Sequence, residues 1–345
     1  MRFGIKLPHS GPLASVEAIS RVALEAERVG LDSVWVHDHI SYGRDWAGHR
    51  ASGLANQITP EYEPDFYESM ATLTYVAGFT KAIRLGTSIL VLPLRNPLVL
   101  GRQAITLQAL SERRLVLGVG IGDYPGDFKA LNVPYTERGR ITDEYLEVLR
   151  KVFRGGRVSH VGRYIRFDEA YFFPKTVPPP IIVGGGVVAV PEPGEDKLNL
   201  AVLRRVARFA EGWMPDWGEP ELIRKGVGML NDLAHDYGRE DVDFEICMSK
   251  TLYLADSDEV ARVETEKSVQ EAERVANIVA GIGIKSPEKA LESSLIGSPD
   301  TLIKRIKDYY EAGVRLFIMT CLSPDLNSFV DTLRRFDREV ASTFR

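Results

Sequence analysis

The chain has 345 residues, 44% of them apolar and 26% charged, which is the composition of an ordinary globular protein. The formal net charge of −5 and the lack of a long basic run argue against nucleic acid as a partner. No run of about 18 apolar residues indicates a membrane span. Residues 1–5 enter a strand pattern directly, so no signal peptide is expected. Cys247 and Cys321 are far apart and are expected to be buried free thiols. These features favour a cytoplasmic enzyme.

Short apolar, β-branched segments alternate with helical patterns along the chain. The expected strands are residues 3–7, 33–37, 84–89, 115–119, 181–183, 212–214, 244–254 and 314–319. The expected helices are residues 15–30, 67–79, 138–153, 198–210 and 298–313, with others beginning at Pro97 and Ser257 and a closing helix over 329–340. A short β excursion is expected at 157–173. About eight strands in this alternation predict one α/β domain over residues 1–345, a (β/α)8 TIM barrel rather than a doubly wound sheet.

Two segments are expected to be insertions at the carboxyl ends of barrel strands. Residues 40–66 follow the second strand, hold several glycines and prolines, and show no clear period. We interpret them as a lid over the mouth of the barrel, the alternative being a surface excursion with no role. Residues 184–199 follow the fifth strand and are expected to form an inserted loop. Active sites of such barrels lie at this carboxyl-end face.

Two neighbouring strands end in residues that are unusual for a buried strand. The third strand turns polar at Thr87 and Ser88, and prolines then prevent it from continuing. This pattern fits either a site-forming strand end or an ordinary βα loop. The fourth strand ends in the glycine-rich run 118–122, where a flat ring or another backbone could come close. Asp123 follows as a carboxylate at the rim.

The second strand ends in His37-Asp38-His39, the most reactive-looking tripeptide of the chain. Residues two apart on a strand share a face, so both histidines could point into the barrel. A metal site of the His-x-His type would need further ligands, and no metal is expected. The other interpretations are a packed aromatic side chain and acid–base or hydrogen-bonding work by His39. His39 lies nearer the mouth and is the expected working residue, whereas Asp38 points to the other side and is better placed to hold the loop.

Several long motifs resemble, in the same order, those of the bacterial luciferase-like superfamily of flavin- and deazaflavin-dependent oxidoreductases. The matching segments cover nearly the whole chain and include residues 34–39, 85–97, 114–122, 137–146, 179–185 and 210–213. The resemblance implies a (β/α)8 barrel with the cofactor at its carboxyl-end mouth. One branch of the superfamily uses FMN and the other uses coenzyme F420, an 8-hydroxy-5-deazaflavin. Asp38-His39 resembles the F420 branch.

The three glycines 184–186 after the fifth strand could form a phosphate-binding turn or a simple tight turn. Here it departs from the Gly-Gly-Ser or Gly-Gly-Asn turn that is usual in the superfamily. FMN-dependent members often carry Ser or Thr at this point, so its absence favours the deazaflavin.

The resemblance also implies the residues of the site. Trp46 lies near the position of an active-site tryptophan, and Asp123 stands where sugar-phosphate dehydrogenases of the F420 branch carry a catalytic glutamate. The expected catalytic residues are therefore His39, Trp46 and Asp123. The expected cofactor-binding residues are Asp38, Thr87, Ser88, Ile89, Gly120, Gly122, Gly184, Gly185 and Gly186. The polar break in the third strand and its match to the superfamily motif predict a cis peptide bond at Ser88–Ile89.

The expected function is hydride transfer between coenzyme F420 and a small organic substrate. One alternative is an FMN-dependent monooxygenase that uses O₂ and reduced flavin from a separate reductase. Another, from a different class, is a catalytically silent cofactor-binding homologue. A homodimer or higher homo-oligomer is expected, with no nucleic-acid or membrane partner.

Overall fold

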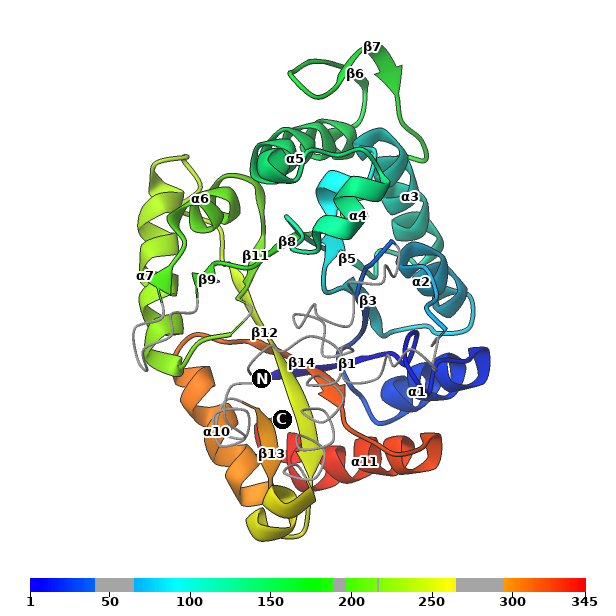
Figure 1. The fold of residues 1–345 in the computed structure, drawn as a ribbon, viewed down its shortest axis with the longest axis vertical. Helices are drawn as coiled ribbons and strands as arrows, with labels where there is room; N and C mark the ends of the chain where they lie inside the picture. Colours follow the sequence, from blue (N-terminus) through cyan, green and yellow to red (C-terminus); the bar gives the residue numbers. More distant parts are fainter. Residues whose placement is uncertain (41–64, 189–196, 216, 265–293) are drawn as a thin grey trace.

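Eight parallel strands close into a barrel in the computed structural model, which describes residues 1–40, 65–188, 197–215, 217–264 and 294–345 (Figure 1). The barrel strands are β1 (Arg2–Lys6), β2 (Ser33–Val36), β3 (Arg84–Thr87), β5 (Leu115–Gly120), β8 (Ile181–Gly184), β11 (Gly212–Met214), β12 (Glu245–Leu254) and β14 (Leu316–Cys321). The ring is closed because β14 pairs with both β1 and β12, while β11 pairs with both β8 and β12. The predicted TIM barrel is confirmed.

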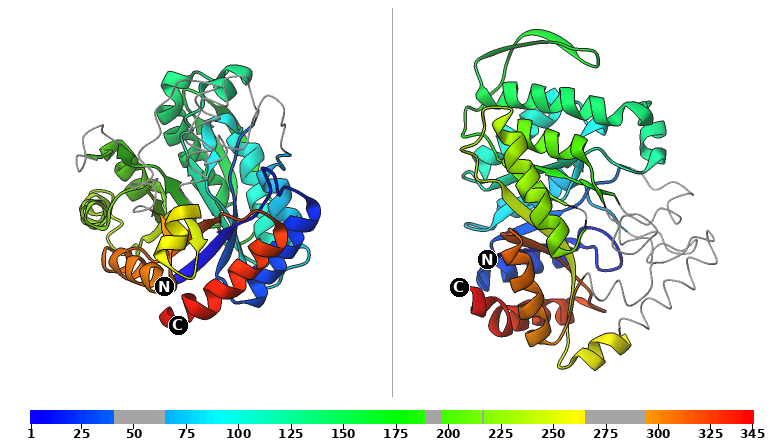
Figure 2. Two further views of the ribbon diagram at one scale, coloured as in Figure 1. Left: turned by 60° about the horizontal axis from the view of Figure 1, so that its bottom comes forward. Right: turned by 90° about the vertical axis from the view of Figure 1, so that its left-hand side faces the viewer.

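Helices surround the strands, and the two termini lie near each other (Figures 1 and 2). The main helices are α1 (Val16–Arg28), α2 (Ser69–Ala77), α3 (Pro97–Leu110), α5 (Arg138–Arg154), α6 (Leu200–Phe209), α7 (Pro220–His235), α10 (Pro299–Glu311) and α11 (Leu326–Glu339). The expected caps are present, since Ser15 accepts a hydrogen bond from the amide of Ala18 and Ser298 from that of Thr301. None of the helices in the described ranges combines the length and apolar character that crossing a membrane requires.

The elements absent from the sequence prediction include α7, the short helix α4 (Pro125–Ala130) and the strand β13 (Leu295–Gly297). α7 begins with a proline in its first turn, which is a start signal, but its glycines obscure the helical pattern. Gly226 is needed because a Cβ there would lie 2.4 Å from the Trp213 ring. The helix expected from Ser257 is present at residues 258–264, and its continuation falls outside the described residues.

The β excursion is an antiparallel hairpin, β6 (Arg157–Val161) and β7 (Arg166–Tyr171), which projects from the barrel (Figure 2). The short strands β9 (Val187–Val188) and β10 (Lys197–Leu198) pair with each other and flank the inserted loop after β8. Residues 41–64 of the expected lid and 189–196 of the expected loop lie outside the described residues.

Trp35 fills the interior of the barrel. Its ring is fully buried, and its indole N–H donates to Ser33 Oγ at 2.8 Å. The neighbouring strands make room for it with Gly4 and Gly86, where a Cβ would lie 2.5 Å and 2.2 Å from the Trp35 side chain. Around it packs an apolar layer formed by Val116, Ile182, Met214, Cys247, Leu316 and Ile318. The interior is thus a packed core, as expected for a barrel of eight strands.

The amino ends of the strands are tied by ion pairs. Arg84 binds Glu245 at 3.0 Å and Asp32 at 3.2 Å, and Arg2 binds Glu245 at 2.9 Å. Arg84 and Glu245 are only 22% and 15% exposed in their side chains, so these pairs are partly shielded from solvent. The network joins β1, β3 and β12 at the end away from the expected site.

Close packing between β3 and β5 gives a stability prediction. A Cβ on Gly118 would lie 1.8 Å from the backbone oxygen of Thr87, which cannot move without breaking the sheet. We expect Gly118→Ala to lower the free energy of unfolding by about 3 kcal/mol or more. In the matched control Gly228→Ala, on an exposed face of α7 with no atom within 4 Å, we expect a gain of about 1 kcal/mol. Urea denaturation of both variants measures this, and equal stabilities would contradict the packing argument.

Candidate active site at the mouth of the barrel

Asp38, directly after β2, accepts several hydrogen bonds at the mouth. It is 3% exposed and accepts hydrogen bonds from the Val91 amide at 3.0 Å and from Arg95 at 2.5 and 3.0 Å. Ser69 Oγ, whose hydroxyl also donates to the His37 carbonyl, lies 3.3 Å from the same carboxylate. The carboxylate therefore ties the segment after β2 to the short strand β4 (Leu90–Val91) and to the start of α2. This geometry matches the predicted loop-holding role and leaves little of Asp38 for a cofactor to contact.

His37 is fixed by hydrogen bonds on several sides. Its Nε2 lies 3.1 Å from Ser10 Oγ, and its carbonyl oxygen accepts from Ser69 Oγ at 2.7 Å. The His9 ring packs edge-on against it with centroids 4.4 Å apart, and His9 Nε2 lies 3.0 Å from the same carbonyl. Burial, and then the nearby charges of His9 and Lys6, hold the pKa of His37 well below its ordinary value. His37 is therefore a neutral, positioned ring.

His39 faces a carboxylate that the sequence did not single out. Its Nδ1 lies 3.6 Å from Oδ2 of Asp127 on α4, within ion-pair range but long for a hydrogen bond. The same oxygen accepts from the Ile40 amide at 3.3 Å. The side chains of His39 and Asp127 are 12% and 2% exposed, so the pair lies mostly away from bulk water. Such a carboxylate can hold an imidazole in one orientation.

Asp123 was the expected catalytic acid, and that role stays a prediction. The residue is exposed, and its backbone oxygen accepts from the Tyr135 hydroxyl at 3.0 Å. The acid beside His39 is Asp127, four residues later. Pro125 at the start of a helix, with an acid in the first turn, was the available signal. Trp46, the third expected catalytic residue, lies outside the described residues.

The end of β3 carries the predicted cis peptide bond, Ser88–Ile89, which is confirmed. Thr87 Oγ1 donates to the Gly118 carbonyl at 2.7 Å and is fully buried, so its hydroxyl serves the sheet. Ser88 Oγ is buried and has no hydrogen-bond partner among the described residues. A polar atom in that position is available to a ligand.

Two of the expected cofactor glycines are required by Ile89. A Cβ at Gly120 would lie 2.5 Å from Ile89 Cδ1, and one at Gly184 would lie 2.7 Å from Ile89 Cγ2. Ile89 is itself partly exposed above the apolar layer that surrounds Trp35. These glycines therefore leave room for the Ile89 side chain, which forms part of the floor of the mouth.

The other expected glycines have backbone roles. Gly122, Gly185 and Gly186 have positive φ angles of 71°, 96° and 109°, a conformation that favours glycine. Gly185 bridges the strand ends, because its amide donates to the Met214 carbonyl at 3.0 Å and its oxygen accepts from Trp213 Nε1 at 2.7 Å. Phosphate binding by this turn stays a prediction.

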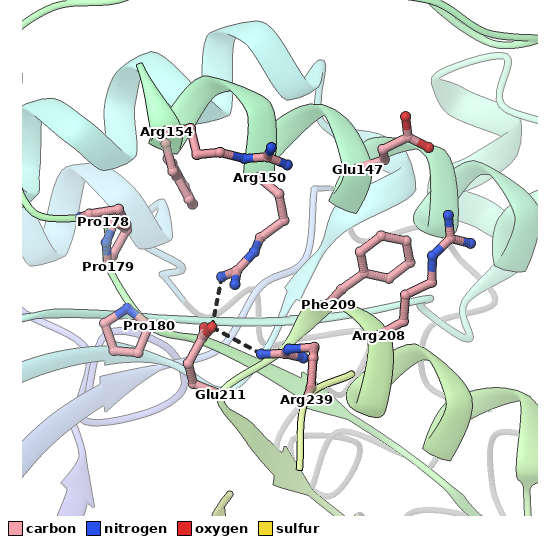
Figure 3. Close-up of a pocket in the computed structure, with 11 residues that line it drawn as sticks. Glu147, Arg150, Arg154, Pro178, Pro179, Pro180, Arg208, Phe209, Glu211 and Arg239 are labelled. Carbon is pink, nitrogen blue, oxygen red and sulfur yellow. Dashed lines mark hydrogen bonds and ion pairs between the residues drawn. The ribbon is translucent and has the colours of Figure 1, made fainter. Parts of the chain in front are cut away.

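A separate cavity of about 740 Å³ lies at the opposite end of the strands, near the C-terminal ends of α5 and α6 (Figure 3). Glu211 binds Arg150 at 2.8 Å and Arg239 at 3.4 Å, and accepts from the Ile181 amide at the start of β8. Arg239 also donates to the carbonyl oxygens of Ala207 and Ala210, which end α6. These contacts stabilise strand and helix ends and do not resemble a reaction site. Within the described residues, no cluster of three or more potential metal ligands occurs.

Comparisons with known proteins agree with this architecture. The model of the luciferase-like monooxygenase family matches residues 1–316. An F420-dependent glucose-6-phosphate dehydrogenase from Amycolatopsis mediterranei is 25% identical over 338 residues, covering 94% of this chain and 93% of that protein. The monooxygenase RslO1 from Streptomyces bottropensis has the same fold, with a TM-score of 0.78 and 23% identity over 100% of both chains. An F420-dependent secondary alcohol dehydrogenase aligns with a TM-score of 0.76 and 18% identity, covering 99% of this chain and 98% of that one.

The neutral state of His37 gives a pH prediction. The His37 pKa is lower in the folded protein than its ordinary value of 6.5, so below about pH 6.5 the unfolded chain binds more protons than the folded one. The contribution of His37 to stability is therefore present above pH 6.5 and is lost as the pH falls. We expect the free energy of unfolding to fall less steeply between pH 6.5 and 5 in His37→Asn than in the wild type. If the free energies of unfolding, measured by urea denaturation, fell equally with pH in both proteins, His37 would be protonated in the folded state.

Proposed function

The chain belongs to the luciferase-like monooxygenase family, and on that premise we propose that it is an oxidoreductase that transfers hydride between coenzyme F420 and a small organic substrate. The observation that carries the proposal is the His39–Asp127 pair at the mouth of the barrel. Similarity to an F420-dependent dehydrogenase over 94% of the chain supports the choice of the deazaflavin. When bound, coenzyme F420 supplies the carbon centre that accepts or gives up the hydride.

The residues at the mouth fit a flat, polar-edged ring. Ile89 offers a partly exposed apolar surface that Gly120 and Gly184 keep in place. The buried hydroxyl of Ser88 lies next to it and can donate to, or accept from, a ring edge. In this proposal Ser88 and Ile89 hold the ring, and the turn at Gly184–Gly186 receives the phosphate-bearing tail.

His39 is the proton-transfer residue in this proposal. Oxidation of an alcohol releases a proton from the substrate oxygen, and the reverse reaction returns it. An imidazole exchanges protons readily at neutral pH. Asp127 would hold the ring in one orientation and stabilise the positive charge that forms on it, as a carboxylate does in other histidine–acid pairs. His37, which is held neutral by its surroundings, would only position its neighbours.

The first test is the identity of the cofactor. Purified protein is titrated with oxidised F420 and separately with FMN, and binding is followed by fluorescence. We expect F420 to bind at least tenfold more tightly, because the turn after β8 lacks the Ser or Thr that many FMN-dependent members carry. Tighter binding of FMN would replace the proposal with an FMN-dependent monooxygenase. Tight F420 binding without turnover on any alcohol or sugar phosphate would indicate a silent homologue.

The second test concerns the histidine–acid pair. With a substrate found by screening alcohols and sugar phosphates, we expect His39→Gln to lower turnover by ~10²–10⁴ while F420 affinity stays within twofold. Asp127→Asn should lower turnover by about tenfold or more, since it removes the orienting charge. The matched control is Asp123→Asn, which changes an exposed acid four residues away and should keep wild-type turnover. If Asp123→Asn lost turnover and Asp127→Asn did not, the orienting acid would be Asp123, and the role proposed for Asp127 would be refuted.

A further inference from the structure

Lys6, the last residue of β1, points into the barrel. It pairs in register with Trp35, and Gly4, two residues earlier, pairs with Ile318. Trp35 and Ile318 both belong to the interior layer, whereas Ile5 packs in the core between strands and helices. Alternation along the strand therefore directs the Lys6 side chain inward, one layer closer to the mouth than Gly4.

No carboxylate compensates the charge of Lys6 among the described residues. Burial is the only cause of its lowered pKa, which is about 8, and no acidic group raises that value. Its charge lowers the pKa of both His9 and His37, so its neighbours are groups that stay neutral. Asp38 and Asp127, two acids at the mouth among the described residues, have other partners: Asp38 binds Arg95, and Asp127 faces His39.

A partly buried, uncompensated ammonium lowers the stability of the free protein. Destabilising groups of this kind are typical of functional sites, where stability is traded for activity. We propose that Lys6 is the anion-binding residue of the mouth, where its ammonium binds a negatively charged oxygen of the ligand. The proposal rests on the proposed function for the nature of that ligand. The oxygen would belong either to the cofactor ring, whose dione edge carries negative charge after reduction, or to a carboxylate or phosphate of the substrate.

Lys250 provides a matched control. Burial lowers its pKa to about 8 as well, but Lys250 is buried and lies on the outer side of β12. Its Nζ donates to the Tyr309 hydroxyl at 2.9 Å, and that hydroxyl donates to the Gly218 carbonyl at 3.0 Å. Both lysines thus have a pKa lowered by burial, and of the two it is Lys6 that faces the mouth.

The first experiment compares stability with affinity in Lys6→Met, Lys6→Arg and Lys250→Met. Without ligand, we expect Lys6→Met to melt at or above the wild-type temperature, and Lys250→Met to melt lower. Titration with oxidised and with reduced F420, and with FMN in both redox states, measures affinity. If the oxygen belongs to the cofactor, Lys6→Met weakens binding of the reduced cofactor at least tenfold relative to the wild type. Binding of the oxidised cofactor should weaken less. Lys6→Arg should restore most of the loss, and Lys250→Met should stay within twofold of the wild type.

The second experiment tests whether the negatively charged oxygen belongs to the substrate. Calorimetric titration with inorganic phosphate and with acetate, with and without saturating cofactor, should show binding to the wild type and to Lys250→Met but not to Lys6→Met. This experiment does not need a bound cofactor, so it decides the role of Lys6 even if neither F420 nor FMN binds. Unchanged affinity for both cofactors and both anions in a folded Lys6→Met would overturn the inference. A preference of the wild type for FMN would refute the proposed function and leave the role of Lys6 to be decided by these titrations.

Discussion

A buried carboxylate holds the mouth of this barrel together. Asp38 accepts hydrogen bonds from the Val91 amide and the Arg95 guanidinium, which lie 53 and 57 residues further along the chain. Removing one partner of a buried pair of this kind typically costs about 3–5 kcal/mol. His37 and His39 flank Asp38, so the direction of each ring depends on this anchor. Because Asp38 points away from the interior, its two neighbours in the sequence lie on the mouth side, one bonded to Ser10 and the other facing Asp127.

The two ends of the barrel differ in how fully their charged and polar groups are paired. At the amino ends of the strands, Arg84 and Arg2 share Glu245, and Arg84 also binds Asp32, so the charges there balance locally. At the mouth, Lys6 has no carboxylate to compensate it among the described residues, and Ser88 Oγ is buried without a partner. Satisfied polar groups stabilise the fold, whereas unsatisfied ones are costly unless a ligand completes them. This contrast supports the proposal that a ligand binds at the mouth of the barrel.

The sequence predicted most of the fold because its signals are local. Apolar runs, prolines at helix starts and serine caps predicted the alternating strands and helices, and the motif at Ser88–Ile89 predicted the cis bond. The site was predicted less well because its contacts are long-range. Asp127 faces His39 across 88 residues of sequence, from a six-residue helix that the prediction did not include. Cofactor binding by the glycines stays a prediction, and their packing contacts could not be read from spacing. Gly120 and Gly184 admit Ile89, and Gly118 admits the backbone of Thr87, which only the register between β3, β5 and β8 reveals.

The central claim is that a deazaflavin ring occupies the mouth beside Ile89, with His39 on its substrate side. The most direct test is a crystal structure of the protein with oxidised F420 and a bound alcohol or sugar phosphate. The account predicts the ring in contact with Ile89 and Ser88, and a substrate oxygen within about 3 Å of a His39 ring nitrogen. A ring bound in the arginine-lined cavity between α5 and α6, or a substrate oxygen placed away from His39, would contradict it.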